Sequence, residues 1–203
     1  MKNYLLTALF LLAVTLGATA QKSKKSKSTP SAATYKVDAL HSSLVFVVGY
    51  KMSEFHGSFG EMTGTINLAD ETDFTTAEVD FMVPIASINT NSKTRDGHLQ
   101  GERYFNAAEA PLATFKSSSI KNLGNNKYEV TGDLTLSGTT LAQTIYVTLL
   151  DSGEVQDQNG KVMNLMGINA DFSFNRSNFG ITGGLSFVTD KVEVTGALSM
   201  VKQ

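Results

Sequence analysis

The feature that most constrains this chain is a two-residue alternation of apolar and polar side chains near its C-terminal end. Between Ile168 and Asn175 every even-numbered residue is apolar and every odd-numbered residue is polar. Nearly the same alternation runs from Lys191 to Met200. A side-chain period of two places alternate residues on opposite faces of a β-strand. We therefore predict two strands here, each with one apolar and one polar face.

Six further segments share this pattern. They span residues 35–50, 57–68, 76–85, 113–120, 128–136 and 143–150. Eight antiparallel strands with one mainly apolar face are typical of a closed barrel or a two-sheet sandwich. Glycines in the second, fifth and eighth segments favour the strong coiling of a barrel. We predict an all-β, eight-stranded antiparallel barrel, and we interpret Gly57, Gly60 and Gly64 as bends or bulges in its second strand.

The alternation stops between the third and fourth predicted strands, where residues 92–105 favour a short helix. This segment holds the densest polar cluster of the chain, Arg95-Asp96 followed by His98. One hypothesis places the cluster at the mouth of the barrel as a polar contact for a ligand headgroup. The other is structural, with an Arg95–Asp96 ion pair that fixes the helix end and its loop. Both remain open at this stage.

The N-terminal residues are predicted to be a targeting segment. Lys2 precedes an apolar run over residues 4–16, and Ala18-Thr19-Ala20 is typical of a signal-peptidase site. We therefore predict a signal peptide at 1–20, a Lys/Ser-rich disordered linker at 21–33 and one folded domain at 34–203. A protein cleaved near Ala20 would be periplasmic or secreted. The linker lysines could also add a peripheral attraction to an anionic membrane.

Composition excludes several kinds of function. The chain has no cysteine, so it has no disulfide, thiol nucleophile or thiolate metal site. Of its 17 basic residues five precede residue 29, which leaves twelve against 19 acidic residues, a net charge near −7 that argues against nucleic-acid binding. The three histidines show no metal-ligand spacing, and we predict no cofactor. A hydrolase that pairs His98 with Asp96, or His41 with Ser42, is the catalytic alternative.

Phenylalanines dominate the predicted inner face. Eleven of the twelve lie beyond the predicted signal peptide, and five of these occupy inward positions: Phe46, Phe81, Phe115, Phe172 and Phe174. An eight-stranded barrel is just wide enough to be filled by side chains or to hold one small ligand. The residues therefore allow a hollow binding barrel and also a filled barrel that acts as a stress or interaction module, and they leave a homodimer open.

Short motifs spread over most of the domain resemble those of the YceI-like proteins. In chain order they are Tyr35-x-Val37-Asp38, His41-Ser42-Ser43-x-Val45-Phe46, Gly57-x-Phe59 with Gly64-x-Ile66, Ile88-x-Thr90, Arg95-Asp96-x-His98-Leu99, Phe105 with Pro111 and Phe115, Gly132-x-Leu134-x-Leu136-x-Gly138, Arg176-x-x-Phe179-Gly180, and Asp190-x-Val192. Together they cover residues 35–201. The chain departs from the family at Tyr50, where the family often has histidine.

The resemblance implies a secreted, lipocalin-like barrel that binds a long apolar chain and performs no catalysis. The implied ligand is a polyisoprenoid, an isoprenoid quinone or a fatty amide. The implied ligand contacts are inward side chains: Phe46, Val48, Phe81, Phe115, Phe172 and Phe174. To these we add, as predicted ligand-binding residues, Arg95 and His98 of the polar cluster and Tyr50.

Overall fold

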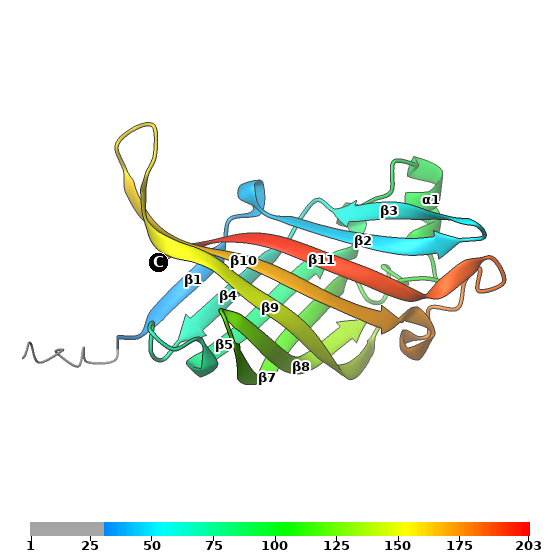
Figure 1. Ribbon diagram of the computed structural model, residues 1–203. Helices are drawn as coiled ribbons and strands as arrows, with labels where there is room; N and C mark the ends of the chain where they lie inside the picture. The colour runs from blue at the N-terminus through cyan, green and yellow to red at the C-terminus, as the bar shows by residue number, and fades with distance from the viewer. Residues whose placement is uncertain (1–30) are drawn as a thin grey trace, which may run out of the picture.

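The computed structural model describes residues 31–203 as a closed antiparallel barrel of eight strands (Figure 1). The predicted signal peptide, and residues 21–30 of the predicted linker, lie outside the described residues. The barrel begins at Ala33, one residue before the predicted domain start. Within 31–203, no helix has the length and apolar character that a membrane crossing requires.

Three of the eight strands are each divided into two labelled segments. The segments are β1 (Ala33–Val37) with β2 (Ser43–Tyr50), β3 (Ser53–Phe59) with β4 (Thr63–Leu68), and β5 (Ala77–Pro84) with β6 (Ile88–Asn89). The other five strands are β7 (Leu112–Gly124), β8 (Lys127–Leu136), β9 (Thr139–Gln156), β10 (Val162–Asn175) and β11 (Val188–Lys202). The predicted short helix is α1 (Lys93–Leu99), between β6 and β7.

The first predicted strand is not continuous. Val37 of β1 pairs with Met200, and Ser43 of β2 pairs with Ala197 of the same strand, β11. Between them a short 3-10 helix (Ala39–His41) bulges outward, and the Asp38 carboxylate caps it by accepting a hydrogen bond from the backbone N–H of Leu40 at 3.1 Å. The prediction of one strand over 35–50 is therefore correct for its two ends, which pair with the same strand, and wrong for residues 38–42, which are not in a strand.

The second and third strands break side by side. The backbone N–H of Gly60, between β3 and β4, donates to the carbonyl of Ser87, between β5 and β6, at 3.0 Å. Gly60 thus lies at a bend, as predicted. Gly57 and Gly64 instead pair in regular register with Phe46 and Phe81, so neither marks a bulge.

Several strands run further than the alternation predicts, and β9 and β10 show this most clearly. β8 begins at Lys127, which pairs with Thr148 of β9. Beyond that point β9 has lost β8 as a neighbour and pairs with β10 alone. The resulting two-stranded ribbon projects past the barrel wall (Figure 1). Its residues 151–154 are mostly polar and exposed, so they carry no alternation that could reveal the strand.

The connections divide the barrel into two ends. We call one the helix end, because it holds α1, the β2–β3 turn at 51–52 and the β10–β11 loop at 176–187. The opposite base end holds the loop at 69–76 and the tip of the β9–β10 hairpin.

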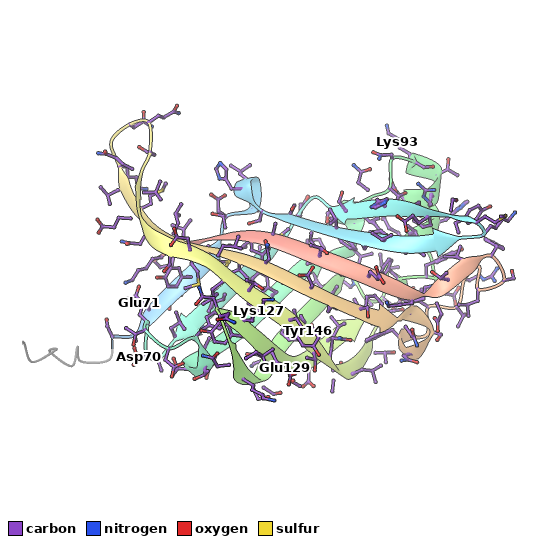
Figure 2. The ribbon with its side chains drawn as sticks, viewed as in Figure 1. Asp70, Glu71, Lys93, Lys127, Glu129 and Tyr146 are labelled. Carbon is purple, nitrogen blue, oxygen red and sulfur yellow. The ribbon has the colours of Figure 1, made fainter. Side chains whose placement is uncertain are left out.

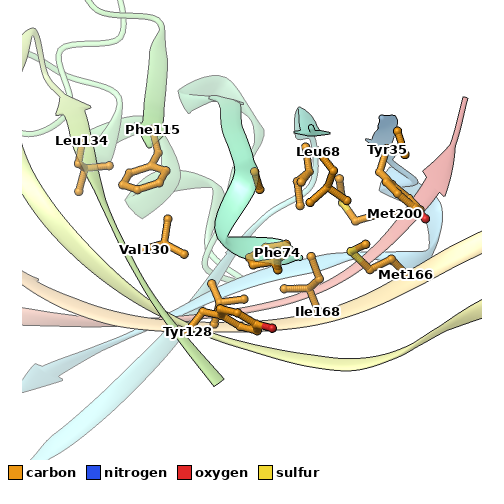
Figure 3. Packing of buried hydrophobic residues seen from close by; sticks show 14 of the residues in the cluster. Tyr35, Leu68, Phe74, Phe115, Tyr128, Val130, Leu134, Met166, Ile168 and Met200 are labelled. Atoms are coloured by element: carbon orange, nitrogen blue, oxygen red, sulfur yellow. The ribbon is translucent and has the colours of Figure 1, made fainter. Parts of the chain in front are cut away.

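The packed core lies toward the base end. Tyr35, Leu68, Met166 and Met200 gather there, and each is at most 5% exposed (Figure 3). Phe74 packs onto Tyr128 with ring centroids 4.9 Å apart. These side chains close the base, so any open interior must lie between them and the helix end.

Candidate functional site

A cavity of about 540 Å³ occupies the barrel between this core and the helix end. Its floor includes Ile66, Phe74 and Ile168, and its walls are almost entirely apolar. The polar lining residues are few and belong mainly to the helix end: Ser53, Glu54, Arg95, His98, Thr114 and Arg176. The volume lies within the range of roughly 300–1,000 Å³ that is usual for ligand pockets. The barrel is therefore not filled by its own side chains.

All nine ligand-contact residues predicted from the sequence line this one cavity. The six apolar wall residues are buried or half-buried: Phe46, Val48, Phe81, Phe115, Phe172 and Phe174. Tyr50 and His98 are exposed at the mouth, and Arg95 is half-buried beside them. Closing the sheet brings the seven strand residues together because alternate residues of every strand face the same interior. Arg95 and His98 reach the mouth from α1.

Two of the wall phenylalanines lie flat over glycines of neighbouring strands. A Cβ atom built on Gly57 would lie 2.2 Å from Cζ of Phe46, and one built on Gly64 would lie 2.4 Å from Cδ1 of Phe81. The missing side chains therefore leave the space in which the two rings rest against the wall. If Gly57 and Gly64 carried side chains, the two rings would be pushed into the lumen, so these glycines keep the lumen open.

Aromatic contacts also order the part of the wall that β10 forms near the helix end. Phe172 and Phe174, two residues apart on β10, stack with centroids 6.2 Å apart and an interplanar angle of 24°. Phe174 meets Phe179 edge-on at 5.4 Å. Offset and edge-to-face arrangements are the favoured geometries of aromatic pairs. This wall is thus held in place by contacts within the protein.

Arg95 and Asp96 do not pair with each other as the structural hypothesis predicted. Both bind buried Thr90: Arg95 Nε donates to Thr90 Oγ1 at 2.7 Å, and Asp96 Oδ1 accepts from the Thr90 N–H at 2.8 Å. The Arg95 guanidinium also lies 4.5 Å from the ring centroid of Phe55. Thr90 thus anchors α1, and it holds the Arg95 cation at the cavity mouth.

Arg176 is a second fixed cation at the helix end. Its guanidinium donates to four backbone carbonyls, those of Thr189 at 2.9 Å, Ile181 at 3.2 Å, Gly183 at 2.6 Å and Val188 at 3.2 Å. Burial lowers the pKa of Arg176, while the nearby Asp190 carboxylate opposes that shift. These four hydrogen bonds hold the β10–β11 loop folded around the Arg176 guanidinium.

Several lining residues were missed by the sequence analysis. Phe55 and Phe59 belong to β3 and continue the same alternation through Gly57. Starting that strand at Ser53 would have found Phe55, while Phe59 was inside the predicted strand but was not assigned to its inner face. Tyr104 and Phe105 come from the turn after α1, where no period-two signal exists.

The two catalytic pairs considered from the sequence are not formed. His41 Nδ1 lies 2.7 Å from the Asp38 carboxylate, while the Ser42 hydroxyl accepts from the backbone N–H of Ser199 at 3.0 Å. Asp96 is bound to Thr90, and His98 is exposed at the mouth. In the described part of the chain, no group of three or more His, Cys, Asp or Glu side chains could hold a metal ion.

An eight-stranded antiparallel barrel with an apolar interior that reaches one end is a lipocalin-like barrel. Within this class, residues 35–200 match the family model described as the YceI-like domain. The chain belongs to the YceI-like family, as the motifs predicted.

Comparison with individual proteins agrees with this assignment. Protein YceI of Salmonella newport is 31% identical over 175 residues, which cover 85% of this chain and 88% of that protein. The crystal structure of Burkholderia cenocepacia BcnA superposes with a TM-score of 0.71 at 26% identity, covering 80% of this chain and 98% of that chain. A domain of Saccharophagus degradans described as polyisoprenoid-binding has a TM-score of 0.61 at 16% identity, covers 83% of this chain and 98% of that one, and shares the fold.

Proposed function

We propose that this protein binds one long-chain apolar lipid inside its barrel and carries it outside the cytoplasm. The supporting observation is the apolar cavity of about 540 Å³, whose polar lining is confined mainly to the mouth. The ligand class is a polyisoprenoid, an isoprenoid quinone or a fatty amide. The proposal for this chain rests on the cavity and on family membership, while the Saccharophagus degradans domain contributes a shared fold.

The walls favour a chain over a compact polar ligand. Each methylene that leaves water for an apolar site contributes about 0.8 kcal/mol. Ten buried methylenes would thus contribute about 8 kcal/mol before the entropy lost on binding is subtracted. Phe46, Phe172 and Phe174 supply wide apolar contact along this path. Tight binding therefore needs few polar contacts.

The polar end of the ligand is proposed to lie at the mouth. Arg95 is held there by Thr90, and His98 and Tyr50 are exposed beside the opening. A polar or anionic headgroup would leave its chain in the lumen and keep its own oxygens near Arg95. This arrangement supports binding and carriage rather than catalysis, because neither candidate catalytic pair is formed.

The test is native mass spectrometry of the protein purified from its own host, with organic extraction of the same sample. We expect one apolar molecule per chain. Phe172→Arg places a charge on the inner wall and should abolish retention of that lipid. Ser173→Arg is the matched control, because Ser173 is the next residue on β10 and is exposed.

The result has clear alternatives. Extraction of no lipid from the wild-type protein, or full retention by a folded Phe172→Arg variant, would refute carriage. The first of these results would favour an interaction module that uses its outer surface, whereas the second would place the lipid outside the lumen. N-terminal sequencing of the same sample tests the proposed cleavage near Ala20 and thereby the secreted location.

A further inference from the structure

Four large apolar side chains are exposed on two loops at the helix end. Met52 in the β2–β3 turn is fully exposed, while Phe187, Leu185 and Tyr50 are 46%, 42% and 40% exposed. We call this group, Tyr50, Met52, Leu185 and Phe187, the rim. Contiguous apolar side chains in water often mark a contact surface.

The rim is a single surface, and it is continuous with the cavity. The backbone N–H of Lys51 donates to the carbonyl of Phe187 at 3.0 Å, and this bond joins the two loops. The rings of Tyr50 and Phe187 meet edge-on with centroids 6.0 Å apart. Both rings also line the cavity. Apolar surface therefore runs without interruption from the lumen to the outside of the molecule.

Charge is distributed unequally between the two ends. Residues 180–189, which carry half of the rim, contain no charged side chain, and Lys51 lies between Tyr50 and Met52. At the base end, residues 69–78 contain Asp70, Glu71 and two further acidic residues but no lysine or arginine. Figure 2 shows Asp70 and Glu71 at one end of the molecule and Lys93 at the other. Residues 50–52 and 180–189 thus carry one lysine and no acidic side chain, which suits an anionic surface. At the base end, Glu71 is paired with Lys202 at 2.6 Å, and the other three acidic residues of 69–78 remain.

We propose that the rim docks on a phospholipid bilayer and that the lipid enters and leaves the barrel there. The exchange step rests on the proposed function, whereas the docking rests on the rim itself. A stable protein interface uses roughly 20–30 residues a side, and the rim offers four side chains at loop tips. Apolar side chains beside a lysine suit the interfacial region of a bilayer, which needs no complementary shape.

A site-specific reporter can test the docking, because the chain contains no tryptophan. We expect the emission of Met52→Trp to shift to the blue when vesicles of phosphatidylcholine and phosphatidylglycerol are added. Leu150→Trp is the matched control, since Leu150 is 56% exposed on β9 beyond the barrel wall. Its emission should not change.

A second pair of variants measures what the rim contributes. Met52→Ser with Leu185→Ser removes two apolar side chains that do not line the cavity. We expect vesicle partition to fall by at least about tenfold, with retention of bound lipid unchanged. The control pair, Leu150→Ser with Val162→Ser, alters two exposed apolar side chains on the β9–β10 ribbon and should leave partition unchanged.

Each contrary result has a distinct meaning. If Met52→Trp shows no emission shift with any vesicle, the docking proposal is wrong. Either a protein then occupies the rim, or the lysines at 22–27, outside the described residues, are what attracts the vesicle. Equal loss of partition in both serine pairs also overturns it. A shift at position 52 in a protein that yields no lipid on extraction supports docking and refutes carriage, so the two failures are distinguishable.

Discussion

The lumen should lose ligand capacity when alanine replaces the glycines beneath the wall phenylalanines. In the variant Gly57→Ala with Gly64→Ala, the new Cβ atoms would lie 2.2 and 2.4 Å from the rings of Phe46 and Phe81, whereas ordinary contact begins at 3.4 Å. Each ring must therefore move inward by about 1 Å or more. The lumen beside the rings is open, so they can move without unfolding the wall.

The stability of the variant should change little. Overpacking a dense core costs about 1–3 kcal/mol, and an open lumen places this variant at the low end. Replacing a strand glycine by alanine offsets about 0.5–1 kcal/mol at each site. We therefore expect the free energy of unfolding to change by about 1 kcal/mol or less, as measured by urea denaturation.

Lipid binding should suffer more than stability. If each displaced ring excludes one methylene of the ligand, the variant loses about 1.6 kcal/mol of binding free energy, or roughly fifteenfold in affinity. Titration with a fluorescent long-chain lipid measures this loss. Gly196→Ala is the control, because it adds a methyl group to the same cavity with no contact closer than 3.7 Å. Equal affinity in the two variants would refute the idea that the glycines keep the lumen open.

Two further predictions concern the ends of the barrel. Hydrogen bonds from Lys202 and then Tyr35 lower the pKa of Glu71, so its contribution to stability is complete above the ordinary pKa of glutamate and is lost as pH falls through the lowered value. Burial and then Glu71 raise the pKa of Tyr35 from 10 to about 12, so its contribution is complete below pH 10 and is lost as pH rises toward 12. Urea midpoints measured against pH should show both losses, with Glu71→Gln removing the acid one; an unchanged acid dependence would contradict this assignment. At the helix end, Arg176→Lys should lower the free energy of unfolding by about 2–3 kcal/mol, because carbonyl groups lose charged donors. Exposed Arg103→Lys should stay within about 0.5 kcal/mol, and equal effects of the two would deny Arg176 its role in the loop.

The strands could be predicted because their signal is local. Whether Phe172 and Phe174 share a face depends only on their spacing, and period two settles it. The breaks could not be predicted in the same way. The bulge after Val37 exists because the six-residue step from Val37 to Ser43 lies opposite only the three-residue step from Met200 to Ala197 on β11. No local pattern records where a distant strand will pair.

The contacts at the cavity mouth could not be predicted from local patterns either. The Arg95–Asp96 ion pair of the structural hypothesis is not formed. Their common partner is Thr90, which the sequence places before the helix but does not orient. Tyr104 and Phe105 reach the cavity through a turn that carries no periodic signal.

The sequence by itself determined that the barrel would have a phenylalanine-rich inner face, since alternation fixes which side chains point inward. It could not decide whether that face encloses a filled core or a cavity. The tertiary structure decided this through cross-strand register, which sets Phe46 over Gly57 and Phe81 over Gly64. A ring opposite a glycine lies on the wall, whereas the same ring opposite a larger residue would occupy the lumen.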